Sequence, residues 1–373
     1  MKKTQLNKTY FIYFSVILVF VLLRIASSFG VFSFVKNATV LSLVTSVIIQ
    51  VLILFLLPFI LTKFLLKKPC KQIFKDYKFK KINFKVVLIS FALGVLACIL
   101  NFFIAFIFSA FISMLGYEGL RSLATSTYSY DTLLKFLVGV FCVGILPAFC
   151  EEFLHRGFVL NETQKNIGYK RAIIISSILF GLMHLNINQV FYAIILGLIM
   201  GFVVVACDNI WPAVIMHFTN NFINVYLEFA TVKSLPLGNL NNLFFGIFSQ
   251  NFAVGIFVSS LVICFAVFGI IYLISILFKN TRYKQIENSF LLLQNDIQSV
   301  ENDGNPLSVE EAKLGFDIYF KERFKNTNSL IDLMIPKSEQ DNKKPTLKNN
   351  IFLIGSLVLG IIITVFTFIW GVF

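Results

Sequence analysis

Residues 133–160 read "LLKFLVGVFCVGILPAFCEEFLHRGFVL", a run that is apolar and long enough to cross a bilayer yet carries adjacent glutamates, a histidine and an arginine. A transmembrane helix needs about 20 mostly apolar residues. Ionisable side chains at membrane depth are costly, and they mark functional sites by default. This run therefore predicts a membrane-embedded fold with a polar site inside it.

The rest of the chain has the same apolar character. Hydrophobic residues make up 57% of it and its mean hydropathy is +0.83, whereas soluble domains contain about 45–50% apolar residues. The pattern predicts an all-α polytopic membrane protein with about nine transmembrane helices, an eight-helix core region followed by a C-terminal span. The predicted spans are 10–29, 38–61, 86–114, 133–160, 172–187, 189–206, 211–230, 251–278 and 350–372.

Basic residues gather in particular connections, which predicts the orientation of the chain. The connection 63–85 holds nine lysines and one aspartate, and lysines also precede the first span. Because cytoplasmic loops carry an excess of Lys and Arg, we expect the N-terminus, 63–85, 161–171 and 280–349 to be cytoplasmic and 115–131 to lie outside. Membrane orientation thus accounts for the net charge of +13, and no nucleic-acid partner is expected.

Other patterns narrow the possible functions. The sequence contains no GxxxxGK(S/T) phosphate loop, no GxSxG nucleophile elbow and no HExxH motif. It therefore does not favour an ATP-driven protein, a serine hydrolase or an HExxH zinc protease. The six cysteines lack CxxC spacing and are expected to be free thiols. Within the polar segment, residues 308–324 read as one amphipathic helix. Arg24, near the outer end of the first span, is expected to snorkel to the membrane interface.

The three histidines of the chain, His155, His184 and His217, each fall in a different predicted core helix. At about 1.5 Å per residue from the nearest cytoplasmic helix end, Glu151 lies about 15 Å deep, His184 about 20 Å and His217 about 9 Å. A helix tilt of roughly 20° can absorb that spread. A shared site in the cytoplasmic half of the membrane is therefore feasible.

Helical spacing assigns partners within this site. Glu152 and Arg156 are four residues apart and can pair along one helix, which predicts a structural ion pair. Glu151 is rotated by about 100° from Glu152, so its carboxylate can face another helix. His217 and Asn221 are also four residues apart, so an imidazole and an amide point the same way.

These residues carry a family resemblance. "EEFLHR" at 151–156, "FGLMH" at 180–184 and "HFTNN" at 217–221 resemble the EExxxR, FxxxH and HxxxN motifs of the CPBP intramembrane proteases, which include CAAX prenyl endopeptidases and bacteriocin-processing, Abi-type proteins. Three such motifs in order on consecutive core helices are specific, and they cover about residues 130–230. His155 departs from the family pattern, where apolar residues are common.

The resemblance implies hydrolysis of a peptide bond in a membrane-associated or prenylated substrate or a peptide precursor. It implies that Glu151 activates water positioned by His184, that His217 and Asn221 stabilise the oxyanion, and that Glu152 and Arg156 support them. Alternatively Glu151, His184 and His217 could bind a zinc-like divalent metal, and the sequence leaves this choice open.

The predicted spans, together with the resemblance at about 130–230, divide the chain into parts and predict its location. The expected parts are N-terminal transmembrane helices at 1–129, a catalytic core at 130–230, a further helix at 231–279, a cytoplasmic polar segment at 280–349 and a C-terminal helix at 350–373. The expected partners are the lipid bilayer, in a bacterial plasma membrane, and a peptide or protein substrate. A proton-coupled transporter or a catalytically silent scaffold or immunity protein are the alternatives.

The predicted orientation can be tested by cysteine labelling in intact cells. A cysteine placed at residue 75 should react with a membrane-permeant thiol reagent and resist an impermeant one, because it lies in the lysine-rich connection predicted to be cytoplasmic. Labelling of residue 75 by the impermeant reagent from outside would reverse the topology.

Overall fold

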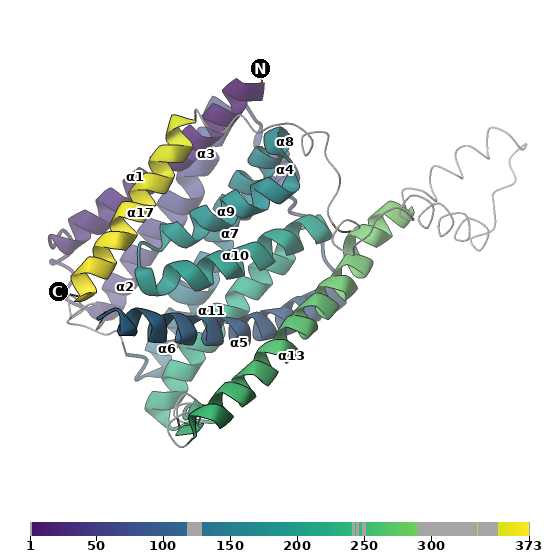
Figure 1. The fold of residues 1–373 in the computed structure, drawn as a ribbon. Helices are drawn as coiled ribbons and strands as arrows, with labels where there is room; N and C mark the ends of the chain where they lie inside the picture. The colour runs from purple at the N-terminus through teal and green to yellow at the C-terminus, as the bar shows by residue number, and fades with distance from the viewer. Residues whose placement is uncertain are drawn as a thin grey trace, which may run out of the picture.

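The computed structural model describes residues 2–117, 129–240, 243, 246–247, 251–288, 334 and 350–372, and the regular elements among them are helices (Figure 1). The predicted amphipathic helix at 308–324 lies outside these residues. The main helices are α1 (Lys2–Ser28), α2 (Ala38–Ser46), η1 (Val47–Leu56), α3 (Leu57–Leu65), α4 (Cys70–Asp76), α5 (Phe84–Met114), α6 (Leu133–Gly139), η2 (Val140–Ile145), α7 (Leu146–Glu152), η3 (Phe153–Leu160), α8 (Asn161–Ile167), α9 (Tyr169–Met183), α10 (Ile187–Cys207), α11 (Trp211–Lys233), α13 (Phe252–Phe278), η4 (Lys279–Tyr283) and α17 (Ile351–Val372).

Each of the nine predicted spans coincides with a helix, and in the described part of the chain seven helices are long and apolar enough to cross a membrane. The all-α polytopic membrane fold is thereby confirmed. The two remaining spans differ from the others. Helix α9 has 15 residues, so it rises about 22 Å and falls short of a hydrocarbon core of about 30 Å. Helix α11 has 23 residues, but its apolar surface is interrupted by the polar run 217–221.

The predicted end of the fourth span at residue 160 is wrong, because residues 161–171 are helical except at Gly168. Helix α8 continues the preceding helix to Ile167, Gly168 turns the chain with a φ of 83°, and α9 begins at Tyr169. Glu162 is fully buried in α8 and accepts a hydrogen bond from Lys68 Nζ at 2.6 Å. Ion pairs with the lysine-rich connection thus allow this polar sequence to be helical and buried. The hydrophobic periodicity of one helix does not reveal such contacts with another segment.

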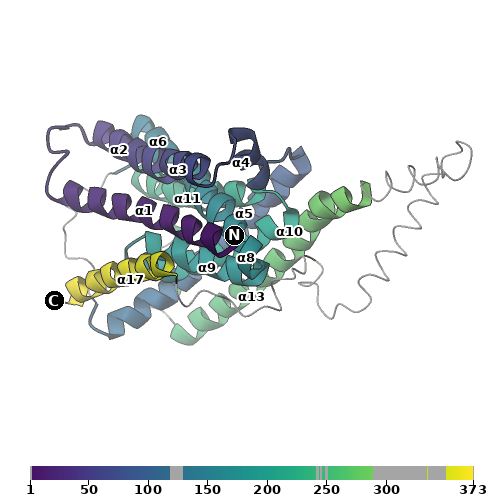
Figure 2. The same ribbon diagram turned by 90° about the horizontal axis from the view of Figure 1, so that it is seen from above.

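The first and last spans lie side by side in both views (Figures 1 and 2). Asn350 Nδ2 donates to Asn7 Oδ1 at 2.9 Å, and the Phe11 and Phe352 rings meet edge to face with centroids 5.0 Å apart. These contacts at the beginning of both helices show that α1 and α17 run parallel. The C-terminal span therefore extends the bundle through α1, while α13 packs along α5 on the opposite side.

Part of the lysine-rich connection is fixed by ion pairs at the N-terminal end of the bundle. Lys68 Nζ contacts Asp76 as well as Glu162, both at 2.6 Å. Lys78 and Lys80 both pair with Asp208, which follows the end of α10. These pairs attach the connection to α8 and α10, and they neutralise some of the charge that the sequence concentrates there.

Helices α5 and α11 approach each other closely at Gly94. A Cβ atom placed on Gly94 would lie 2.6 Å from Thr219 Cβ and 3.1 Å from Met216 Cα, both on α11. Because Met216 and Thr219 flank His217, this glycine sets how far His217 projects into the bundle. The contact leaves no room for a methyl group without moving a helix.

We predict that Gly94→Ala destabilises the protein by about 1–3 kcal/mol, the usual cost of overpacking a core. The measurement is the thermal unfolding midpoint in detergent. Gly144→Ala is the matched control, because its Cβ would meet Phe218 at an ordinary 3.4 Å and alanine otherwise favours a helix. Equal midpoints for the two variants would show that the α5–α11 contact is not tight.

Candidate active site

The paired glutamates lie in a short α-helical segment between two π-helical ones. Helix α7 ends at Glu152, η2 precedes it and η3 follows it. Wide π turns are frequent at functional sites because they rotate side chains out of the regular helical register. Pro147, at the start of α7, has no N–H to donate to the Val143 carbonyl, and that carbonyl accepts a hydrogen bond from Asn221 Nδ2 at 2.8 Å. The Val143 carbonyl, which Pro147 leaves without a helical donor, therefore links the helix of the first motif to Asn221 of the third motif.

The predicted Glu152–Arg156 pair is present and includes a third partner. Glu152 Oε1 accepts from Arg156 Nη1 at 2.9 Å and from His217 Nδ1 at 3.0 Å, and both charged side chains are fully buried. Since a carboxylate oxygen only accepts, Nδ1 of His217 carries the proton. This leaves Nε2 of His217 directed at Glu151.

Arg156 reaches two further helices. Its Nη2 donates to the Gly197 carbonyl of α10 at 3.2 Å, and its guanidinium carbon lies 4.3 Å from the centre of the Phe180 ring of α9. The side chain therefore contacts groups from α7, α9 and α10, and it connects through Glu152 to α11. This supports the structural role predicted for the pair.

The Glu151 carboxylate is held at one oxygen and open at the other. Its Oε1 accepts from Gln50 Nε2 at 2.9 Å. Its Oε2 is buried, has no hydrogen-bond partner among the described residues, and lies 4.0 Å from His217 Nε2. That separation is too long for a direct hydrogen bond. The two atoms face each other across a gap that one small polar group could bridge.

Gln50 was missed in the sequence analysis. It lies in η1, where it is the single polar side chain in the run "VIIQVLILFL", residues 47–56. A lone amide within a membrane span is costly unless it has a hydrogen-bond partner, and this signal could have marked it. The sequence alone does not identify that partner as Glu151, which is 101 residues away.

Phe180 brings the histidines together. Its ring lies edge to face with the rings of His155, His184 and His217, with centroids 5.1, 5.2 and 5.8 Å away. Helix α9 ends at Met183, so it stops four residues before the predicted end at 187, and His184 stands at its C-terminal cap. The three motifs thus meet around one aromatic side chain.

His155 has a separate environment. Its Nδ1 donates to the Glu151 backbone carbonyl at 2.9 Å, and its Nε2 lies 3.4 Å from the Tyr13 hydroxyl. The Tyr13 hydroxyl also donates to the Leu179 carbonyl at 3.0 Å. The His155 side chain is fully buried, and it does not line the cavity beside the Glu151 carboxylate. Its contacts are those of a packing residue that links α1 to the core.

A cavity of about 680 Å³ adjoins the Glu151 carboxylate. Glu151, His184, His217 and Asn221 all line it, together with Gln50, whereas Glu152 and Arg156 lie behind its wall. Further lining residues come from the parts of α5, α10 and α11 that lead away from the lysine-rich connection, namely Asn101, Phe102, Ala105, Gln189, Tyr192, Asn220 and Asn224. The cavity therefore extends toward the end of the bundle opposite the N-terminus.

The depth expected for Glu151 needs correction. That depth was counted from Asn161, but the helix continues to Ile167. Sixteen residues separate Glu151 from this end, which corresponds to about 24 Å at 1.5 Å per residue. Glu151 lies near the middle of the helical stretch Leu133–Ile167 and not close to one of its ends.

The residues of the alternative metal site are not gathered into a tight cluster. Within the described residues, no three His, Cys, Asp or Glu side chains converge as metal ligands. His217 Nδ1 contacts Glu152 and Glu151 Oε1 contacts Gln50, so the remaining donor atoms, His217 Nε2 and Glu151 Oε2, face each other at 4.0 Å.

We predict that Arg156→Met strongly destabilises the fold, by about 3–5 kcal/mol, because it leaves the Glu152 carboxylate buried without its cation. The double variant Glu152→Gln/Arg156→Met should recover much of that loss, since a neutral amide can still accept from His217. Thermal unfolding of the wild type and the three variants measures the coupling. Additive losses would show that the two side chains do not act as a pair.

Comparison with known proteins supports the same region. No curated protein and no solved structure matches the chain significantly. Residues 133–223, which contain all three motifs and run from α6 into α11, match the family model described as type II CAAX prenyl endopeptidase Rce1-like. Residues 133–223 are therefore similar to the Rce1-like CAAX prenyl endopeptidases, and the resemblance to the CPBP intramembrane proteases is confirmed over this region.

Proposed function

We propose that this protein is an intramembrane endopeptidase in which Glu151 acts as the general base on a water molecule. The observation that carries the proposal is the Glu151 Oε2 atom, which is buried with no hydrogen-bond partner in the described part of the chain and lies 4.0 Å from His217 Nε2, beside a cavity. The family match supports a CAAX-type protease in general terms. The residue roles are our inference from the geometry.

The first step needs a water molecule held against the base. A water with hydrogen bonds of about 2.8 Å to each side can bridge Glu151 Oε2 and His217 Nε2, whose separation is 4.0 Å. Gln50 holds the other carboxylate oxygen and so keeps Oε2 directed at this position. Glu151 would take one proton from the water as its oxygen attacks the scissile carbonyl carbon.

The tetrahedral intermediate then needs donors for its oxyanion and a proton for the leaving amine. Asn221 lines the cavity, and only one of its two amide N–H groups is needed for the Val143 carbonyl. The other N–H would stabilise the oxyanion. His217, whose proton lies on Nδ1, would accept a hydrogen bond from the water at Nε2 and hold it beside Glu151. Glu151, now protonated, would return its proton to the amine nitrogen as the C–N bond breaks. His184, which lines the same cavity as Glu151 and His217, would help to position the water.

We predict that Glu151→Gln lowers turnover by at least about 10²-fold, the lower range of general-base catalysis, without loss of folded protein. A glutamine keeps the size of the side chain but cannot accept the proton. The measurement is cleavage of a farnesylated peptide ending in Cys-Val-Ile-Met by purified protein, followed by mass spectrometry.

His155→Phe is the matched control, because it changes the ionisable neighbour one turn away while keeping an aromatic ring. It should retain most of the activity, since His155 does not line the cavity. Monodispersity in detergent establishes that each variant is folded. Normal cleavage by Glu151→Gln, or a folded His155→Phe that is equally inactive, contradicts the assignment.

A further inference from the structure

Arg24 lies near the end of α1, and its side chain is exposed. Buried residues recur along the preceding turns of α1 at intervals of three or four, which marks one helical face. They include Tyr10, Tyr13, Ile17 and Val21. Arg24 follows Val21 by three residues, so it lies where this face continues beyond its buried part.

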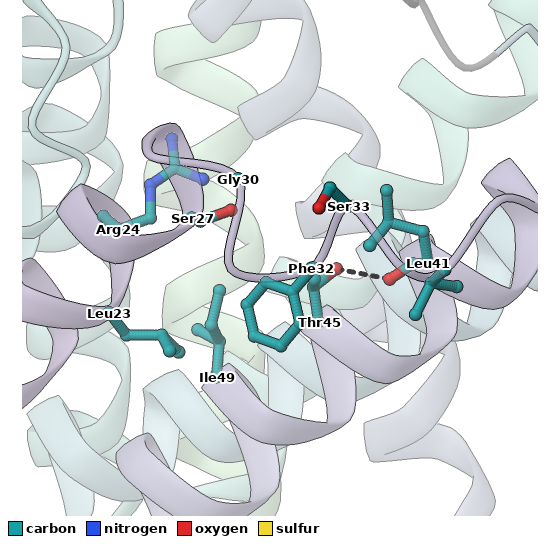
Figure 3. A pocket seen from close by; sticks show the side chains of 10 residues that line it. Leu23, Arg24, Ser27, Gly30, Phe32, Ser33, Leu41, Thr45 and Ile49 are labelled. Carbon is teal, nitrogen blue, oxygen red and sulfur yellow. Dashed lines mark hydrogen bonds between the residues drawn. The ribbon is translucent and has the colours of Figure 1, made fainter.

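The Arg24 side chain borders two cavities. One is the cavity of about 680 Å³ that contains Glu151 and His217. The other, about 370 Å³, lies between the end of α1 and the turn that leads to α2, where Arg24 and Ser27 stand near Gly30 and Thr45 (Figure 3). Within the described part of the chain, no hydrogen bond or ion pair engages the guanidinium of Arg24. It is a fixed positive charge that shares a cavity with the general base.

The lining of the cavity that Arg24 and Glu151 share suits a peptide backbone. Side-chain amides are its main polar groups, and each offers both donors and acceptors. These are Gln50, Asn101, Gln189, Asn220, Asn221 and Asn224. Among the residues that line this cavity, Arg24 is the one Arg or Lys and Glu151 the one Asp or Glu. Side-chain amides can form hydrogen bonds with the N–H and C=O groups of any bound peptide, whatever its sequence. The anionic group that a peptide backbone itself carries is its C-terminal carboxylate.

We propose that Arg24 binds the free carboxylate of the substrate's C-terminal residue. The peptide segment that follows the scissile bond would then occupy the amide-lined part of the cavity, with its C-terminus held by the guanidinium fork. This inference rests on the proposed function, because it assumes that Glu151 marks the scissile bond. A phospholipid phosphate is the competing ligand, and the shared cavity with Glu151 favours the peptide.

The test compares two forms of one peptide. A fluorescent farnesylated peptide ending in Cys-Val-Ile-Met is prepared as the free acid and as the C-terminal amide. Binding to the full chain in phosphatidylcholine nanodiscs is measured by fluorescence anisotropy in a Glu151→Gln background, which prevents turnover. With Arg24 present, the acid should bind at least about tenfold more tightly than the amide, as expected for a charge-assisted hydrogen-bonded pair.

Arg24→Gln should bind acid and amide equally, at the level of the amide. Lys36→Gln is the matched control, because this exposed lysine lies in the same α1–α2 connection and lines neither cavity. It should preserve the discrimination. The values of kcat/KM for the acid and the amide are then compared in proteins that keep Glu151. The protein with Arg24 should prefer the acid, and Arg24→Gln should lose this preference.

Three outcomes overturn the proposal: no binding of the acid, equal binding of acid and amide with Arg24 present, or an Arg24→Gln effect that is equal for both peptides. If that last effect also depends on added phosphatidylglycerol, Arg24 binds lipid phosphate. Acid-selective binding without any cleavage by the wild type would refute the proposed function and leave the carboxylate site standing. Glu151-dependent cleavage without any preference for the acid over the amide would support the proposed function and refute the carboxylate site.

Discussion

The hydrogen-bonded group of Glu152, Arg156 and His217 is the constraint on which the rest of the site depends. Two fully buried charges lie 2.9 Å apart, and the carboxylate also accepts from an imidazole on α11. Removing such charges from water is costly, and the cost is offset only if both partners keep their geometry. Because Arg156 also reaches Gly197 and Phe180, this requirement fixes α9, α10 and α11 against the helix that carries Glu151.

The neighbouring glutamates have different roles because of their rotation along one helix. Glu152 points to the cation and the imidazole, whereas Glu151 points to Gln50 and the cavity. One oxygen of Glu151 is therefore positioned by an amide while the other stays free to react. Adjacent residues of a helix differ by about 100° in direction, and both glutamates lie in the α-helical segment α7 between two π-helical segments.

The cavity extends from Glu151 toward the end of the bundle where Arg24 stands. The matched family region covers residues 133–223, yet Gln50 and Arg24 come from helices outside it. The N-terminal spans therefore contribute to this cavity, since η1 provides the amide that holds the Glu151 carboxylate and α1 provides the one Arg or Lys of its lining. The C-terminal span α17 supports this arrangement by packing along α1.

The sequence by itself determined the features that belong to a single element. Apolar runs predicted the helices, the four-residue spacing predicted the Glu152–Arg156 pair, and three motifs predicted the family. Only the tertiary structure decided the contacts between elements, such as Gln50 with Glu151 and His217 with Glu152. It also decided that the polar stretch after Asn161 stays helical, because Lys68 satisfies Glu162. The physical reason is that periodicity specifies a helical face, whereas the partner of that face depends on how distant helices rotate and pack.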